Sequence, residues 1–212
     1  MSNEAAQPTN ILDTSVSNFV ARTAAKAPTP GGGSVAGVVG ALGVALGEMA
    51  LNFTMGKKKY AEHEASHAHI SARLQNAREM FEQLVHEDIA AYGLYQATSK
   101  QDDGPDKDKA MQTAVAAAIN VPREMTKLSL AVLADLLELS DKCNPWLISD
   151  LLAGGVLAVA TVRLSDFNVR INVPNVVDKQ AADDLYNASK ADVAKAAELL
   201  ERLDEACGKH LK

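Results

Sequence analysis

The sequence has few aromatic residues and almost no cysteine. Phe, Trp and Tyr make up only 4% of its 212 residues, whereas 47% of the chain is hydrophobic. The interior must therefore consist of small and aliphatic side chains, a composition that favours closely packed helices. The two cysteines, Cys143 and Cys207, form no CxxC pair, and no secretory pattern is present at the N-terminus. These absences argue against a disulfide framework and predict a reducing, cytoplasmic location.

The sequence also lacks an excess of positive charge and a long uninterrupted apolar run. Lys and Arg number 21 against 27 Asp and Glu, giving a net charge of −6 and a pI near 5.4. This balance disfavours a nucleic-acid partner. The uncharged stretch 27–47 opens with Pro28, Pro30 and three glycines. About thirteen apolar residues remain where a membrane span needs about twenty, so we expect a buried helix and no membrane partner.

The hydrophobic periodicity predicts an all-α fold, a multihelical array with long antiparallel helices. We expect a single domain over 1–212, with a flexible segment at 1–11. The predicted helices are a short one after a cap at Asp13 or Thr14, then Ser34–Thr54 with Ser34 as its cap, Tyr60–Thr98, a helix ending near Leu139 with a kink at Pro122, one from Pro145 to about Leu164, and one after Asp178. Residues 167–173 alternate in polarity, but a lone strand has no partner, so we expect an extended or irregular segment there.

The predicted glycine-rich helix at 34–54 carries glycines at four positions, which would let bulky neighbours approach its backbone from several sides. We therefore expect it to be the central, buried helix. Asn144 is expected to cap the following helix, with Pro145 in its first turn.

Asp88 interrupts an otherwise apolar seam on the predicted helix 60–98. The seam recurs in steps of four and three, as in packed helices, through Ile70, Leu74, Ala77, Phe81, Leu84, Asp88, Ala91 and Tyr95. A carboxylate buried at such a position costs several kcal/mol unless it is paired or its pKa rises. Active sites tolerate that cost, but a structural hydrogen bond to a neighbouring helix explains the same residue equally well.

His63 and His67 belong to an HExxH pattern, which on a helix can hold zinc. No third ligand follows at a recognisable spacing, and lysines lie just upstream. The pattern therefore does not predict a metal site, and we expect none.

Three further features have a structural and a functional interpretation. Asp150 lies near the start of the helix that Asn144 is expected to cap, where a negative charge interacts favourably with the helix dipole. Its apolar neighbours are also compatible with a functional site. The glycine loop before Ser34 is either a tight turn or an anion cradle at a helix N-terminus. Lys57, Lys58 and Lys59 are either a solvated helix end or an anion site.

Several motifs together closely resemble the formiminotransferase-cyclodeaminase C-terminal family, which includes free-standing methenyltetrahydrofolate cyclohydrolases. They occur in the family's order over about residues 12–205: Pro28-Thr29-Pro30-Gly31-Gly32-Gly33-Ser34, Thr54-Met55-Gly56-Lys57-Lys58-Lys59-Tyr60, Asp88 with Ala91-Tyr92, Val121-Pro122, Asn144-Pro145 with Ser149-Asp150, and Asn168-Val169-Arg170-Ile171-Asn172. Where relatives often read Gly-Asn-Pro-Asn, this chain has Cys143-Asn144-Pro145-Trp146.

The resemblance implies a multihelical homodimer that hydrolyses 5,10-methenyltetrahydrofolate to 10-formyltetrahydrofolate without a further cofactor. It implies a catalytic role for Asp88 and Lys57. Asp88 and Asp150 could exchange the roles of catalytic group and pterin anchor. The residues expected to bind the folate are Gly32, Gly33, Ser34, Lys58, Tyr60, Asp150, Asn168 and Asn172.

Two other functions stay open. Formiminotetrahydrofolate cyclodeamination closes the same methenyl bridge and could use the same pocket. A non-catalytic folate-binding dimer is the second alternative.

Overall fold

The computed structural model describes residues 10–211, and every regular element in this range is a helix. The α-helices are α1 (Val16–Ala24), α2 (Gly32–Asn52), α3 (Glu64–Ser99), α4 (Pro105–Leu139), α5 (Ile148–Asn172) and α6 (Lys179–Cys207). The 3-10 turns are η1 (Ile11–Asp13), η2 (Lys58–His63), η3 (Pro145–Leu147), η4 (Val173–Asn175) and η5 (Gly208–His210). The all-α prediction is confirmed. Of the segment expected to be flexible, residues 1–9 lie outside the described range, and Ile11 is buried.

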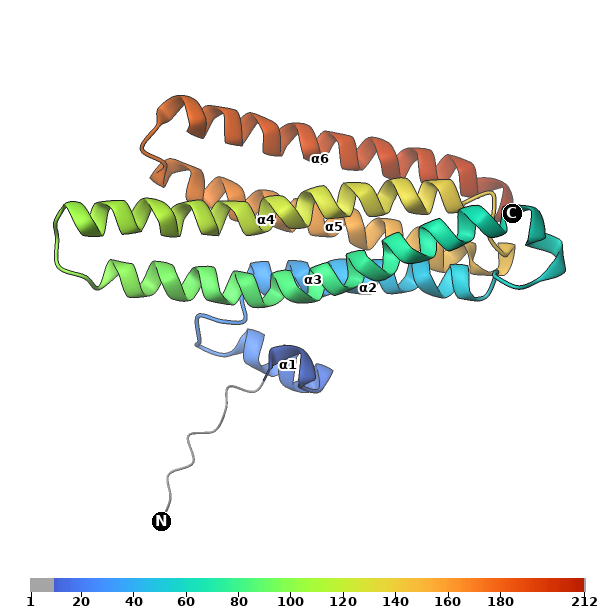
Figure 1. The fold of residues 1–212 in the computed structure, drawn as a ribbon, viewed down its shortest axis with the longest axis horizontal. Helices are drawn as coiled ribbons and strands as arrows, with labels where there is room; N and C mark the ends of the chain where they lie inside the picture. Colours follow the sequence, from blue (N-terminus) through green and yellow to red (C-terminus); the bar gives the residue numbers. More distant parts are fainter. Residues whose placement is uncertain (1–9, 212) are drawn as a thin grey trace, which may run out of the picture.

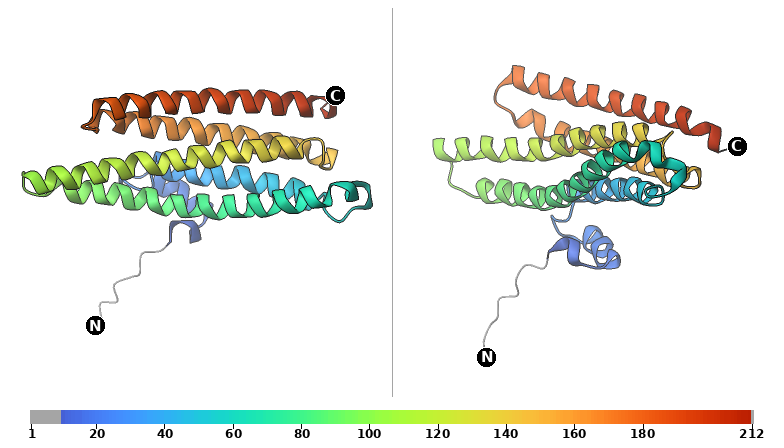
Figure 2. Two further views of the ribbon diagram at one scale, coloured as in Figure 1. Left: turned by 45° about the horizontal axis from the view of Figure 1, so that its top comes forward. Right: turned by 45° about the vertical axis from the view of Figure 1, so that its right-hand side comes forward.

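Consecutive long helices run antiparallel, so the bundle has a simple up-and-down course (Figure 1). Helix α2 packs against α3 and α5, and α4 packs against the same two helices from the other side. Helix α6 covers α4 and α5. Helix α1 stands apart from the bundle in the right-hand view of Figure 2, and none of its residues is buried.

The glycines of α2 allow neighbouring helices to approach its backbone closely, as the sequence predicts. A Cβ added at Gly40 would lie 2.6 Å from Cε1 of Phe81 on α3. One added at Gly43 would lie 3.0 Å from the carbonyl oxygen of Gly154 on α5. Contacts this short leave no room for a side chain, so glycine is required where α2 crosses its neighbours.

Helices α2 and α5 are long and apolar. Within Gly32–Asn52 and within Pro145–Asn175, a window of 18 residues has a mean hydropathy of 1.7, which by length and composition could span a membrane. Of the two windows, 50% and 44% are buried inside this chain. Core helices of soluble proteins share these properties, so we keep the expectation of no membrane partner as a prediction.

Most helix predictions agree with the structure. The apolar seam of α3 is buried from Ile70 to Leu84, with Asp88 and Tyr95 half-buried further along. Helix α4 continues through Pro122, the predicted position of a kink. Asn144 caps η3 by accepting a hydrogen bond from the Trp146 N–H.

The segment 167–173 was predicted wrongly, because α5 does not end near Leu164 but continues to Asn172. Val169 and Val173, four residues apart, are buried, whereas Phe167 and Ile171 are exposed. The same apolar positions fit a strand period and one side of a helix turn. Packing against the neighbouring helices decides between the two.

The predicted cap of α2 is also wrong. The helix begins at Gly32 behind Gly31, and the Ser34 hydroxyl makes no capping bond. It instead donates to a carboxylate on α3. For α1 the cap is Ser15, which directly follows Thr14, the second of the two candidates.

Candidate functional site

Asp88 lies against the first turn of α2. The Ser34 Oγ donates a hydrogen bond to Asp88 Oδ2 at 2.8 Å. Gly33 faces the same carboxylate so closely that an added Cβ would collide with it. The first turn of a helix also carries unsatisfied N–H groups and a partial positive charge. The glycine loop and Asp88, which lie far apart in the sequence, therefore form one unit.

The environment of Asp88 shifts its proton affinity in two opposing ways. Burial disfavours the charged form and raises the pKa of the carboxyl group above its ordinary value. Hydrogen bonds from the side chain and backbone of Ser34 act in the opposite direction, and burial prevails. A carboxylate with a raised pKa is a stronger base than an exposed aspartate and is suited to accept a proton and return it.

Asp88 lines a groove of about 890 Å³ between α3, α4 and α5. Asn168 and Asn172 of α5 line it beside Asp88, and Asn168 also faces Gly32 at 3.8 Å from where a Cβ would stand. Asn172 Nδ2 donates to the Asn168 carbonyl at 2.8 Å, which fixes its amide. We call Gly33, Ser34, Asp88, Asn168 and Asn172 the carboxylate site.

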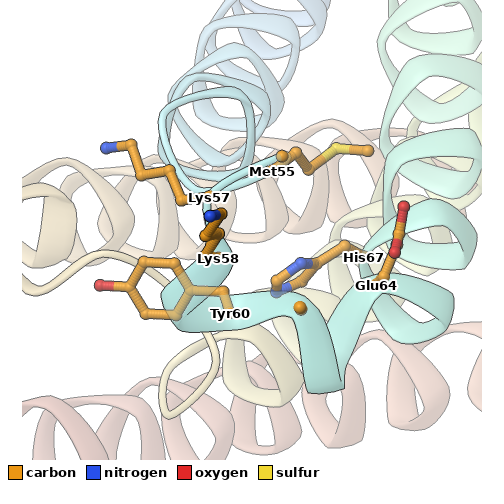
Figure 3. A pocket seen from close by; sticks show the side chains of 8 residues that line it. Met55, Lys57, Lys58, Tyr60, Glu64 and His67 are labelled. Carbon is orange, nitrogen blue, oxygen red and sulfur yellow. The ribbon is translucent and has the colours of Figure 1, made fainter.

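The lysine motif forms a separate pocket of about 540 Å³ at the other end of α2. Lys57, Lys58 and Tyr60 line it, as Figure 3 shows, together with residues from the start of α3. Lys57 and Lys58 are exposed. The chain turns here at Gly56, whose φ of +73° is a conformation that favours glycine. We call residues 55–60 the lysine loop.

Contacts to the α4–α5 connection hold the lysine loop in place. Thr54 Oγ1 donates to the Ala50 carbonyl at 2.7 Å and accepts the backbone N–H of Asn144 at 2.9 Å. The motif that begins at Thr54 and the motif Asn144-Pro145 are therefore in direct contact. Asp150, in the first turn of α5, lies on the same connection and therefore at the lysine end. Trp146 beside it is 89% exposed.

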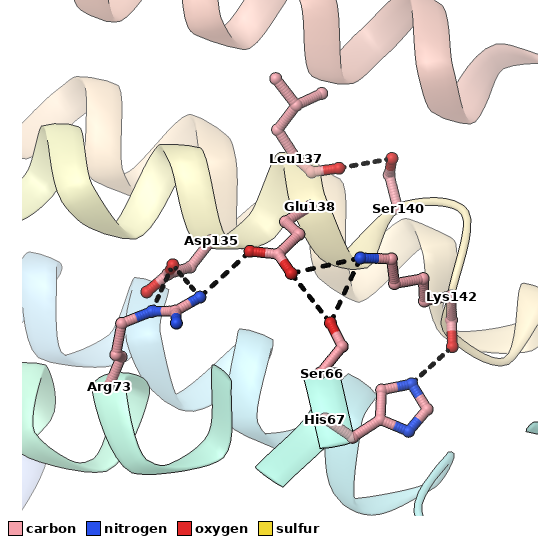
Figure 4. A network of polar contacts seen from close by, with 8 residues as sticks. All are labelled: Ser66, His67, Arg73, Asp135, Leu137, Glu138, Ser140 and Lys142. Carbon is pink, nitrogen blue, oxygen red and sulfur yellow. Dashed lines mark hydrogen bonds and ion pairs between the residues drawn. The ribbon is translucent and has the colours of Figure 1, made fainter. Parts of the chain in front are cut away.

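A polar network extends this support to the beginning of α3 (Figure 4). Glu138 of α4 accepts hydrogen bonds from Ser66 at 2.8 Å and from Lys142 at 3.2 Å. Arg73 pairs with Glu138 at 3.1 Å and with Asp135 at 2.8 Å. These contacts join α3 to α4 just behind the lysine loop.

His67 belongs to this structural network. It is buried, and its Nε2 lies 2.8 Å from the Lys142 carbonyl oxygen. The His63 and His67 rings are 5.9 Å apart, centre to centre, in an edge-on arrangement. Within residues 10–211 no group of three or more His, Cys, Asp or Glu side chains is arranged to hold a metal ion. His67 of the HExxH pattern therefore has a structural contact of its own.

The structure does not bring all of the expected site residues together. Gly32, Gly33, Ser34, Asp88, Asn168 and Asn172 gather at one end of α2, and Lys57, Lys58, Tyr60 and Asp150 lie at the other. The 21 residues of α2 separate the two groups, and at 1.5 Å per residue this is about 30 Å. Asp88 and Lys57 of one chain cannot act on the same atom.

Three polar residues of the groove were not predicted as site residues. Tyr92, Tyr95 and Asn175 line it together with Asp88. The helical spacing of 88, 92 and 95 is the signal that could have identified the tyrosines. Asn175 lies in η4, beyond the segment that was predicted to be irregular, so no pattern pointed to it.

Residues 15–191 match the family Formiminotransferase-cyclodeaminase. The chain is 31% identical over 196 residues to a methenyltetrahydrofolate cyclohydrolase of Methylorubrum extorquens, covering 90% of this chain and 94% of that protein. It is 28% identical to a formimidoyltransferase-cyclodeaminase of Dictyostelium discoideum, covering 90% of this chain but 36% of the longer relative. A crystal structure of a formiminotetrahydrofolate cyclodeaminase from Thermotoga maritima superposes with a TM-score of 0.87, at 26% identity, over 95% of this chain and all of that one.

Proposed function

Because the chain belongs to the formiminotransferase-cyclodeaminase family, we propose that it hydrolyses 5,10-methenyltetrahydrofolate to 10-formyltetrahydrofolate. The Methylorubrum cyclohydrolase matches nearly end to end, which supports this activity. The observation that carries the chemistry is a half-buried carboxylate with a raised pKa, held at the mouth of a groove by the first turn of α2.

Asp88 is the proposed catalytic residue. Water adds to the positively charged methenyl carbon and loses a proton, and the resulting carbinolamine opens at the bond to N5. N5 gains a proton as the hydroxyl group becomes the formyl oxygen, so one proton is released in the whole reaction. Asp88 accepts the proton from water and stabilises the cationic substrate while ionised. A pKa above the ordinary range makes this carboxylate a stronger base than an exposed aspartate.

The remaining residues of the site have binding roles in this proposal. Gly32, Gly33 and Ser34 hold the carboxylate and shape the groove. Asn168 and Asn172 offer amide groups to the polar edge of the pterin. Lys58 and Tyr60 meet the aminobenzoyl-glutamate part, where cations suit the anionic tail. Lys57 keeps the second catalytic role that the resemblance implies, although the length of α2, about 30 Å, separates it from Asp88 of the same chain. Asp150 is the second candidate for anchoring the pterin.

We further propose that the protein works as a homodimer in the cytoplasm, with no metal or additional cofactor. The apolar outer face of α2 supports the dimer, since Leu42 and Phe53 on it are 55% and 53% exposed. Light scattering on the purified chain measures the mass directly. A monomer at micromolar concentration contradicts this part of the proposal.

Cyclodeamination is the second candidate, because the Thermotoga structure and the longer relatives carry that name. The deciding experiment gives the same enzyme preparation both substrates. Loss of methenyltetrahydrofolate absorbance reports the hydrolase, and ammonia release from 5-formiminotetrahydrofolate reports the deaminase. We expect the larger kcat/KM for the methenyl substrate, after the rate in buffer without enzyme is subtracted. A larger value for the formimino substrate assigns the deaminase activity instead.

A further inference from the structure

Three asparagines line the groove beside Asp88, and they differ in what they offer a ligand. Asn168 Nδ2 donates to the Leu164 carbonyl at 2.9 Å, and Asn172 Nδ2 donates to the Asn168 carbonyl at 2.8 Å. These bonds hold both side chains and leave their amide oxygens available as acceptors. The side-chain amide of the third, Asn175, makes no hydrogen bond within residues 10–211, so its N–H groups are all available to a ligand.

Asn175 reaches the groove because η4 continues one face of α5. The spacing of 168, 172 and 175 is that of neighbours on a helix surface, although α5 ends at Asn172. On either side of Asn175, Val173 and Val176 pack in a small hydrophobic cluster with residues of α3, α4, α5 and α6, separate from the main core. This cluster anchors the two valines and leaves Asn175 itself exposed.

Gln112 of α4 holds the backbone around Asn175. Its Nε2 donates to the Asn175 carbonyl at 3.2 Å, and its Oε1 accepts the Val177 N–H at 3.2 Å. In the described range, 10–211, no other side chain from a different helix hydrogen-bonds to the backbone of 173–177. One amide therefore fixes the peptide groups on both sides of Val176. Such an attachment is how a supporting residue fixes the geometry of a neighbouring ligand contact.

We propose that the Asn175 amide binds the pterin ring of the folate and that Gln112 is its positioning residue. The proposal rests on the proposed function, because it places a folate in this groove. The polar edge of a pterin carries N–H donors beside a carbonyl acceptor. The amide oxygens of Asn168 and Asn172 suit the donors, and the N–H groups of Asn175 suit the carbonyl. Gln112 lines a neighbouring groove between α4 and α6 and not this one, so it acts through the backbone of Asn175.

Asn175→Ala tests the ligand contact. Kinetics on 5,10-methenyltetrahydrofolate give KM and kcat, and calorimetric titration with 5-formyltetrahydrofolate, which has the same pterin but no methenyl bridge, gives Kd. We expect KM and Kd to rise about 3- to 10-fold, as for the loss of one hydrogen bond. The change in kcat should be smaller than about twofold, because the pterin is bound alike in the ground and transition states. Wild-type KM and Kd overturn the role of Asn175.

Gln112→Met tests the positioning role, because methionine has a similar length and cannot make the two hydrogen bonds. We expect KM and Kd to rise in the same direction as in Asn175→Ala, with kcat retained. Gln180→Met is the matched control: the Gln180 amide donates to Asp184 at 2.9 Å within α6 and reaches no other helix. Thermal melting followed by circular dichroism compares the stability of both variants. Wild-type KM in Gln112→Met, or an equal rise in Gln180→Met, overturns the positioning role.

The double variant Gln112→Met/Asn175→Ala separates positioning from a general structural effect. If Gln112 acts through Asn175, the double variant has the KM and Kd of Asn175→Ala alone. Effects that multiply show that the two residues act independently, and they overturn the positioning role. A wild-type chain that neither hydrolyses methenyltetrahydrofolate nor binds 5-formyltetrahydrofolate refutes the proposed function, and this inference with it. If wild type does both and the variants match it, only this inference is wrong.

Discussion

The two ends of α2 achieve their chemistry by different means. At the N-terminal end, a half-buried carboxylate is fixed by Ser34 and by a glycine that leaves no room for a side chain. At the C-terminal end, Lys57 and Lys58 are exposed where the chain enters a 3-10 turn, and the Thr54 hydroxyl just before them accepts the backbone N–H of Asn144. The first arrangement is preorganised for one reacting atom. The second suits a long, anionic and variable ligand tail.

The largest effect is expected at Asp88. Asp88→Asn keeps the size of the side chain and removes the charge. If the carboxylate is the general base, kcat falls about 10²–10⁴-fold with the fold unchanged. Steady-state kinetics with circular dichroism measures both. If kcat instead stays near wild type and KM rises, while Asp150→Asn loses kcat, the two aspartates have exchanged roles.

A substitution at Gly33 tests the preorganisation of the same end. In Gly33→Ala the new Cβ collides with the Asp88 carboxylate, which must move. A displacement of about 1 Å at a reacting group can cost about 10²-fold in rate. Gly93→Ala on α3 is the control, because nothing lies within 4 Å of its Cβ position. Equal activity of the two variants would show that the position of Asp88 does not matter.

The lysine loop should respond differently and less strongly. Lys57→Ala is expected to lower kcat about 10- to 100-fold, the value of one hydrogen bond to a charged group. Lys58→Ala should mainly raise KM, because the tail is bound alike in the ground and transition states. Purely KM effects of equal size at both positions would reduce the loop to a nonspecific anion patch.

Asp88 also gives the stability of the carboxylate end a dependence on pH. Burial raises the pKa of Asp88 in the folded protein, so the folded state binds more protons than the unfolded state between the ordinary and the raised value. The contribution of this group to stability is therefore fully present at low pH and is lost as pH rises through the folded pKa. Asp88→Asn removes that loss. Urea unfolding across this range should show the variant gaining stability relative to wild type as pH increases, and a constant difference would contradict the shift.

The smallest effect on catalysis is expected at the histidine motif behind the lysine loop. His67→Ala removes a buried hydrogen bond and should lower the free energy of unfolding by about 1–3 kcal/mol. His69→Ala, at an exposed position nearby, is the control. We expect kcat at saturating substrate to be retained and a chelator to leave activity unchanged. Stoichiometric zinc in the purified protein, lost with His67, would restore the metal interpretation.

The amino-acid sequence determined the helical class and most helix positions, and its motifs supplied the candidate site residues. Periodicity is a local property, and it revealed the seam of α3 together with the polar residue Asp88 within it. The motifs supplied the glycine loop, the lysines and the asparagines. Sequence patterns failed at 167–173, where strand-like alternation and a helix were both compatible with the same apolar positions and only packing separated them.

Only the tertiary structure decided which of these residues meet. The sequence places Ser34 at a helix start, where its local pattern predicts a capping residue. In the folded chain its hydroxyl instead donates a hydrogen bond to Asp88 of α3. Likewise, no sequence pattern separates Asp88 from Lys57 in space. Their distance follows from the length of α2, a rigid helix whose two ends cannot approach each other because its backbone hydrogen bonds fix the rise of every residue.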